Sequence, residues 1–103
     1  MKKNFDQVIT DLNGVVQVAE GKPITAKDII VAALMTSFGD EAISGDEKVK
    51  RFQLAEKLNA GGDVDVVDTE TVLIKQLVSK GYGTLAVGRI YQIIDTDVSA
   101  DKQ

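Results

Sequence analysis

The sequence of 103 residues contains no histidine and no cysteine. These absences remove the commonest general base, the thiol nucleophile, and the imidazole and thiolate ligands of zinc. Without cysteine there is no disulfide framework, which agrees with a reducing cytoplasm. No spacing among the remaining carboxylates, amines and hydroxyls marks a catalytic set. We therefore expect a protein that is not an enzyme and holds no cofactor or metal.

Aromatic residues are also scarce, at 5% of the chain, whereas 44% of the residues are hydrophobic. The core must therefore be built from aliphatic side chains, and the length suits one domain over residues 1–103. No apolar run approaches the roughly 20 residues of a membrane span. The basic N-terminus is not followed by the apolar stretch of a signal peptide. The sequence predicts a cytoplasmic protein with no membrane partner.

Clustered positive charge is a further absence. The net charge is −4, and the twelve basic residues are interleaved along the chain with sixteen acidic ones. Because a nucleic-acid groove needs clustered Lys and Arg to displace counterions, a protein partner or a second copy is favoured over DNA or RNA.

What is present predicts a mainly α fold with a small β element. Residues 5–18 are rich in β-branched side chains and contain Asn13-Gly14, which favours a β-hairpin with a type I′ turn. A polar loop follows at residues 20–22. A compact four-helix core is expected over residues 26–95 and a flexible tail over residues 96–103.

Helical spacing and capping residues locate the four helices. The first runs from Ala26 to Phe38, and the second follows Ser44 and closes at residues 59–62 with left-handed glycines. The third is capped by Asp68 or Thr69, runs to about Lys80 and is expected to be the most buried; the fourth covers residues 84–95. Capping boxes are predicted for residues 25 and 28 and for residues 44 and 47.

Two packing details follow from the same patterns. The second helix should bury Val49, Phe52, Ala55 and Leu58 and leave Arg51 in solvent. Residues 63–67 form a short strand at most, and the extended residues 24–25 and 67–68 are expected to pair as a bridge between two helix starts.

Acidic residues offer the first candidate chemistry. The cluster of Asp63, Asp65, Asp68 and Glu70 suggests a calcium loop, but an EF-hand starting at Asp63 would need an oxygen ligand at position five, a glycine at six and an acid at twelve. Those positions hold valine, aspartate and isoleucine. Helix-entry acids explain the cluster better. Asp6, Asp11 and Asp40 are likewise interpreted as solvated acids of turns and strand edges.

Six residues are candidates for partner binding: Lys48, Lys50, Arg51, Tyr82, Arg89 and Tyr91. The first three form a basic patch for acidic partners, or for nucleic acid in the alternative hypothesis of a packaging or transcription accessory protein. The glycine-rich residues 81–84 do not continue as G-x-G-x-x-G, so they indicate a tight helix connection, with Gly88 allowing close helix packing. The fourth helix start, beside Tyr82 and Arg89, suits an anion or a partner's carboxylate.

Tyr91 belongs to a set of apolar residues beyond the obvious core stripe of the last two helices. An exposed cluster of such residues would mark an interface. The full set is Val64, Val66, Tyr82, Val87 and Tyr91.

Three stretches carry a resemblance to a family. They are Ile9–Gly14 (ITDLNG), Gly45–Phe52 (GDEKVKRF), and Lys80–Gly83 (KGYG) with Val87–Arg89 (VGR). Together they resemble small uncharacterised proteins of tailed bacteriophages and prophages, over nearly the whole chain. The resemblance implies a phage product made in the host bacterial cytoplasm, either an assembly factor or a binder of a host machine, and it transfers no site residues.

The leading hypothesis from the sequence is therefore a small, non-enzymatic protein-interaction module. It would bind a host or phage protein or assemble with itself.

Overall fold

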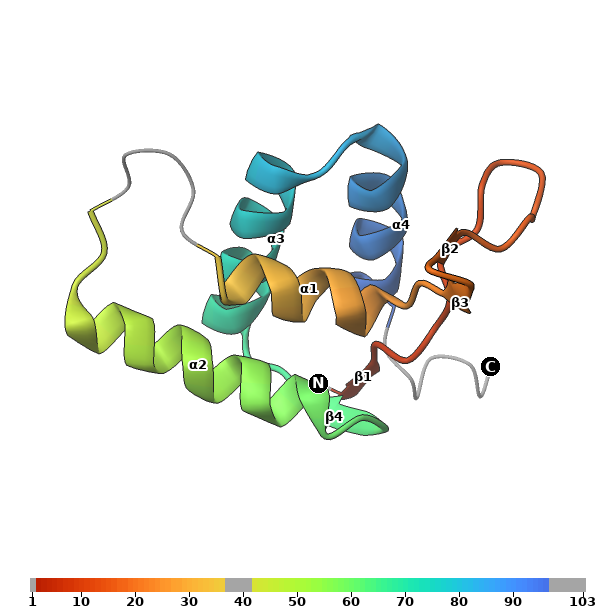
Figure 1. The fold of residues 1–103 in the computed structure, drawn as a ribbon. Helices are drawn as coiled ribbons and strands as arrows, with labels where there is room; N and C mark the ends of the chain where they lie inside the picture. The colour runs from red at the N-terminus through yellow and green to blue at the C-terminus, as the bar shows by residue number, and fades with distance from the viewer. Residues whose placement is uncertain (1, 37–41, 97–103) are drawn as a thin grey trace.

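The computed structural model describes residues 2–36 and 42–96. It contains four helices, α1 (Ala26–Leu34), α2 (Gly45–Asn59), α3 (Asp68–Gly81) and α4 (Thr84–Ile94). The short strands are β1 (Lys2–Asn4), β2 (Val18–Ala19), β3 (Lys22–Pro23) and β4 (Asp63–Asp65) (Figure 1). The predicted class, mainly α with a small N-terminal β element, is confirmed.

Helix α1 lies at the centre of the helical body. It contacts α2 on one side and α3 on the other, and α4 packs on α3 (Figure 1). This position explains why α1, and not α3 as predicted, is the most buried helix. Five of its nine residues are buried, whereas α3 buries three of fourteen and leaves Val72 exposed.

Strand β1 joins the N-terminus to the middle of the chain. It pairs antiparallel with β4, with Lys2 opposite Asp65 and Asn4 opposite Asp63. The short strand predicted after α2 is thus present, but its partner is β1. The predicted bridge between residues 24–25 and 67–68 is wrong, because Thr25 pairs with Val8.

The chain reverses within residues 10–16, inside the predicted hairpin, with Thr10 opposite Val16. The turn differs from the type I′ turn expected at Asn13-Gly14. Asp11 closes it: Oδ1 of its carboxylate accepts hydrogen bonds from the amides of Asn13 (2.8 Å) and Val15 (2.9 Å). A side chain that bonds to the backbone in this way replaces the tight turn.

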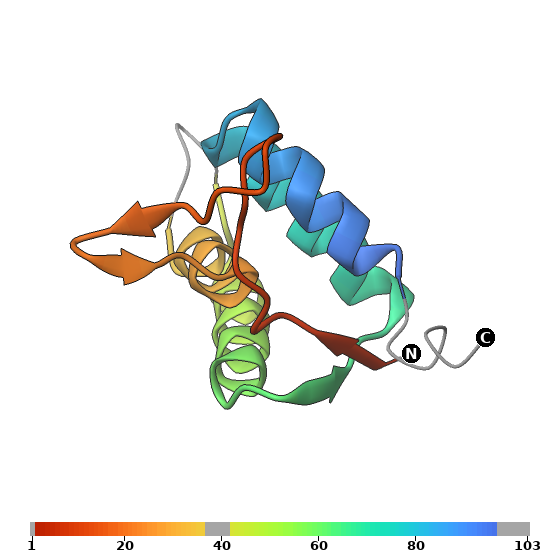
Figure 2. The same ribbon diagram turned by 90° about the vertical axis from the view of Figure 1, so that its right-hand side faces the viewer.

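A second reversal joins β2 to β3 through Glu20 and Gly21. Both residues have positive φ, at 53° and 78°, as a type I′ turn requires. The type I′ geometry therefore occurs at residues 20–22, where the sequence analysis predicted a polar loop without a turn type. Figure 2 shows the β2–β3 hairpin projecting from the helices.

The ends of α1 and α2 follow their capping residues. Helix α1 ends at Leu34 rather than at Phe38, which lies outside the described residues; the Thr36 hydroxyl bonds to the Ala32 carbonyl oxygen (2.7 Å) beyond this end. Helix α2 ends where predicted, and Gly61 beyond it has a φ of +81°. Asp40 and residues 97–103 of the predicted tail also lie outside the described residues.

The capping boxes also differ in detail. The box of α1 is reciprocal: the Asp28 amide donates to Oγ1 of Thr25 (3.2 Å), and the Thr25 amide donates to Asp28 (3.1 Å). For α2, Ser44 accepts from the Glu47 amide, but the Glu47 carboxylate contacts Arg51 instead of closing the predicted box. The N-cap of α3 is Val67 and not the predicted Asp68 or Thr69, because the helix already begins at Asp68.

Helix α2 is rotated relative to the prediction. It buries Arg51, Leu54, Ala55 and Leu58, so two residues of the predicted stripe are correct. Val49 and Phe52 are instead 53% and 49% exposed. Arg51 replaces Phe52 on the inner face because its long aliphatic stem can cover apolar surface.

Candidate functional site

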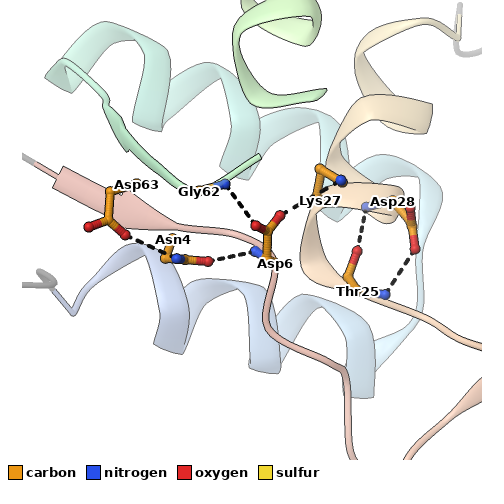
Figure 3. A network of polar contacts seen from close by, with 7 residues as sticks. All are labelled: Asn4, Asp6, Thr25, Lys27, Asp28, Gly62 and Asp63. Atoms are coloured by element: carbon orange, nitrogen blue, oxygen red, sulfur yellow. Dashed lines mark hydrogen bonds and ion pairs between the residues drawn. The ribbon is translucent and has the colours of Figure 1, made fainter. Parts of the chain in front are cut away.

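Asp6 ties the N-terminal segment to the end of α2 (Figure 3). Its Oδ2 accepts a hydrogen bond from the Gly62 amide at 2.7 Å, and its Oδ1 lies 3.7 Å from Nζ of Lys27. Asn4 accepts from the Asp6 amide and donates to Asp63 at 3.0 Å. The Asp6 carboxylate therefore serves the fold, as does the Asp11 carboxylate in its turn.

The acidic residues that suggested a calcium loop do not converge. Asp63 bonds to Asn4, and Glu70 accepts from the Val67 amide (3.0 Å) and pairs with Lys57 (3.0 Å). Within residues 2–36 and 42–96, no group of three or more acidic side chains is arranged to hold a metal ion. The geometry agrees with helix-entry and strand-end acids.

The basic residues of α2 do not form one patch. Arg51 is buried, with Nε 3.4 Å from Oε2 of Glu47. Lys48 and Lys50 are exposed but line different hollows, one beside the end of α1 and the other beside the start of α3. The cationic face required by the nucleic-acid alternative is thereby reduced to two separated lysines.

Arg89 is the most engaged of the six candidates. Its Nε donates to the Thr10 carbonyl oxygen (2.8 Å), Nη2 to the Asp11 carbonyl oxygen (2.7 Å) and Nη1 to Gln92 (3.1 Å). This side chain holds the first reversal of the N-terminal segment against α4, so its guanidinium is engaged by the chain itself and not reserved for an anion beside Tyr82.

The two tyrosines are also used within the chain. Tyr82 is half-buried and packs against the core. The Tyr91 hydroxyl lies 3.0 Å from Oγ of Ser79, and Nζ of Lys75 lies 4.8 Å from its ring centroid. Of the six candidate residues, Lys48 and Arg51 line one hollow, whereas the other four lie elsewhere on the structure.

The apolar cluster expected on the last two helices is also wrong. Val66 is buried at 1% exposure, and the other four residues are partly buried. Three of these, Val64, Tyr82 and Val87, pack against the core. Val64 was not assigned to the core because the contribution of strand β4 was not visible in the helical periodicity.

A polar cleft of about 630 Å³ lies between the N-terminal segment and α4. Its polar side chains largely bond to one another or to the backbone: Asn4 to Asp63, Gln7 to the Asn4 carbonyl oxygen, and Arg89 to Gln92. These hydrogen bonds hold the polar side chains of the cleft in place.

Five of the exposed apolar residues lie instead on the N-terminal segment. We define the hairpin surface as Val8, Leu12, Val15, Val16 and Val18, all of which are exposed. Leu12 is 90% exposed and Val18 60%. Sequence reasoning missed this surface because the β-branched residues were interpreted only as evidence for a β-hairpin. The sequence did contain one indication of it, namely several valines in a segment too short to bury them all.

Comparison with known proteins adds no identification: no family model, curated protein or solved structure matches the chain. No helix in the described residues has the length and apolar character needed to cross a membrane.

Proposed function

We propose that this chain is a non-enzymatic protein-interaction module that binds through the hairpin surface. The observation that carries the proposal is the exposure of five apolar side chains on one short segment, with Leu12 almost entirely in solvent. Exposed apolar surface is unfavourable in water, and large patches of it mark interaction sites, which makes this segment the candidate.

The way the segment is held supports the same function. Arg89 fixes the Thr10 and Asp11 carbonyl groups against α4, and the Asp11 carboxylate closes the turn. A surface ordered in advance loses less conformational entropy on binding than a flexible loop does. The hydrogen bonds of Arg89 and Asp11 therefore hold the hairpin surface in the conformation that would bind a partner.

The proposed setting follows from the resemblance to small phage proteins. We place the protein in the cytoplasm of a bacterial host, where its partner is a phage or host protein or another copy of itself. Nucleic acid suits the hairpin surface poorly, because binding to phosphates relies on clustered cations.

Affinity capture from bacterial lysate tests the function. Wild type is compared with Leu12→Asp, which places a charge at the centre of the hairpin surface, and with Val72→Asp on the exposed side of α3 as the matched control. We expect a bound protein to be retained by wild type and Val72→Asp and lost by Leu12→Asp. Equal capture by all three would overturn the proposal, and so would capture of nothing by any of them if the wild-type chain also stays monomeric.

A further inference from the structure

A shallow apolar groove continues the hairpin surface onto α4. It encloses about 420 Å³ and is lined by Leu12, Thr84, Leu85, Gly88, Arg89 and Gln92. Leu12 stands at its edge and is 90% exposed, so a projecting side chain and a hollow lie on the same face. Figures 1 and 2 show the first reversal beside the start of α4.

An exposed glycine, Gly88, also lies on this face. It is exposed within α4, where glycine is a poorer helix former than alanine. A Cβ atom at this position would meet no other heavy atom of the described chain within 4 Å. The prediction that Gly88 permits close packing between helices of one chain is therefore wrong. Its bare backbone leaves the groove floor open to another molecule.

The charges of the groove and of the whole chain indicate which molecule would occupy the groove. Among the lining residues only Arg89 is charged, and its donors point to the Thr10 and Asp11 carbonyl oxygens and to Gln92. Two copies with a net charge of −4 repel one another in general. Their contact is most favourable where neither presents an acidic side chain, and none of the residues that line this groove is acidic.

We infer that the chain forms a two-fold homodimer in which Leu12 of each copy enters the groove of the other over Leu85 and Gly88. A two-fold contact uses the same patch on both copies, so that patch must contain both the projection and the hollow. This inference rests on the proposed function and names its partner as a second copy.

Sedimentation equilibrium from micromolar to near-millimolar concentration tests the dimer. We expect wild type and Val72→Asp to dimerise with the same dissociation constant. Leu12→Asp should raise that constant by at least about tenfold, since a central apolar contact becomes a buried charge. Circular dichroism should show it folded, because Leu12 makes little contact within its own chain.

Gly88→Ala should stabilise the monomer and weaken the dimer, so the two effects can be measured separately. The added methyl group improves helix propensity and meets open space, so the melting temperature of the dilute monomer should rise. The same methyl group separates the two copies, so the dimer dissociation constant should also rise.

Two results would overturn the homodimer: wild type remaining monomeric at every concentration, or Leu12→Asp dimerising as wild type does. A monomeric wild type that still loses a captured protein on Leu12→Asp would refute the homodimer and leave the interaction function standing. A monomer that captures nothing would refute both.

Discussion

Replacement of Arg89 by methionine tests whether this side chain holds the hairpin surface in place. The substitution keeps an unbranched apolar stem and removes donors to the carbonyl oxygens of Thr10 (2.8 Å) and Asp11 (2.7 Å). Hydrogen bonds from a charged group contribute about 1.5–3 kcal/mol each. Because the site is only part-buried and water can replace some of the interaction, we expect a total loss of about 2 kcal/mol of unfolding free energy.

The assay is urea denaturation followed by far-UV circular dichroism, at a concentration where the chain is monomeric. A loss of about 2 kcal/mol corresponds to a fall of roughly 10 °C in melting temperature for a domain of this size. Arg89→Lys should recover part of the loss, since an ammonium group can still donate to one carbonyl oxygen. Lys50→Met, at an exposed cation of α2, is the control and should stay within about 0.5 kcal/mol of wild type. An Arg89→Met variant as stable as this control would refute the anchoring role.

Further predictions concern the residues that shape the fold. Gly61→Ala should destabilise the protein by about 1 kcal/mol or more, measured by the same denaturation, because φ is +81° and the new Cβ would lie 3.3 Å from the Asp6 carboxylate; a neutral result would contradict the described turn. Thr25→Ala should cost about 1 kcal/mol through loss of the reciprocal cap, a loss that Thr25→Ser should largely avoid. Leu54→Ala should lower the unfolding free energy by about 2–5 kcal/mol and Phe52→Ala by clearly less. The reverse order would instead support the buried face of α2 that was predicted from the sequence.

The boundaries of the helices were largely predictable because they depend on local chemistry. Thr25 and Ser44 accept backbone hydrogen bonds at the starts of α1 and α2, and Gly61 reverses the chain after α2. Each of these interactions joins residues close in sequence, so the pattern of residue types is enough to indicate it.

The buried face of α2 was not predictable in the same way. Two stripes compete in its sequence, one through Phe52 and one through Arg51, and the hydrophobicity of the side chains favours the first. Packing against α1 selects the second, because Leu54 lies on the same face as Arg51. This choice depends on the neighbouring helix and not on the periodicity of α2 itself.

Contacts between distant residues were the least accessible to sequence reasoning. The pairing of Asn4 with Asp63 and the bonds from Arg89 to Thr10 and Asp11 join residues more than fifty positions apart. No local pattern encodes them. The candidate surface depends on these contacts, since they decide which valines and leucines remain in solvent.

Site-specific photo-cross-linking in living bacteria tests the binding surface most directly. A photoreactive amino acid replaces Leu12 in one variant and Val72 in the other, both of which are exposed positions. Our account predicts a defined protein adduct at position 12, with a second copy or with another protein, and no corresponding adduct at position 72. The absence of an adduct at position 12, or equal yields at the two positions, would contradict it.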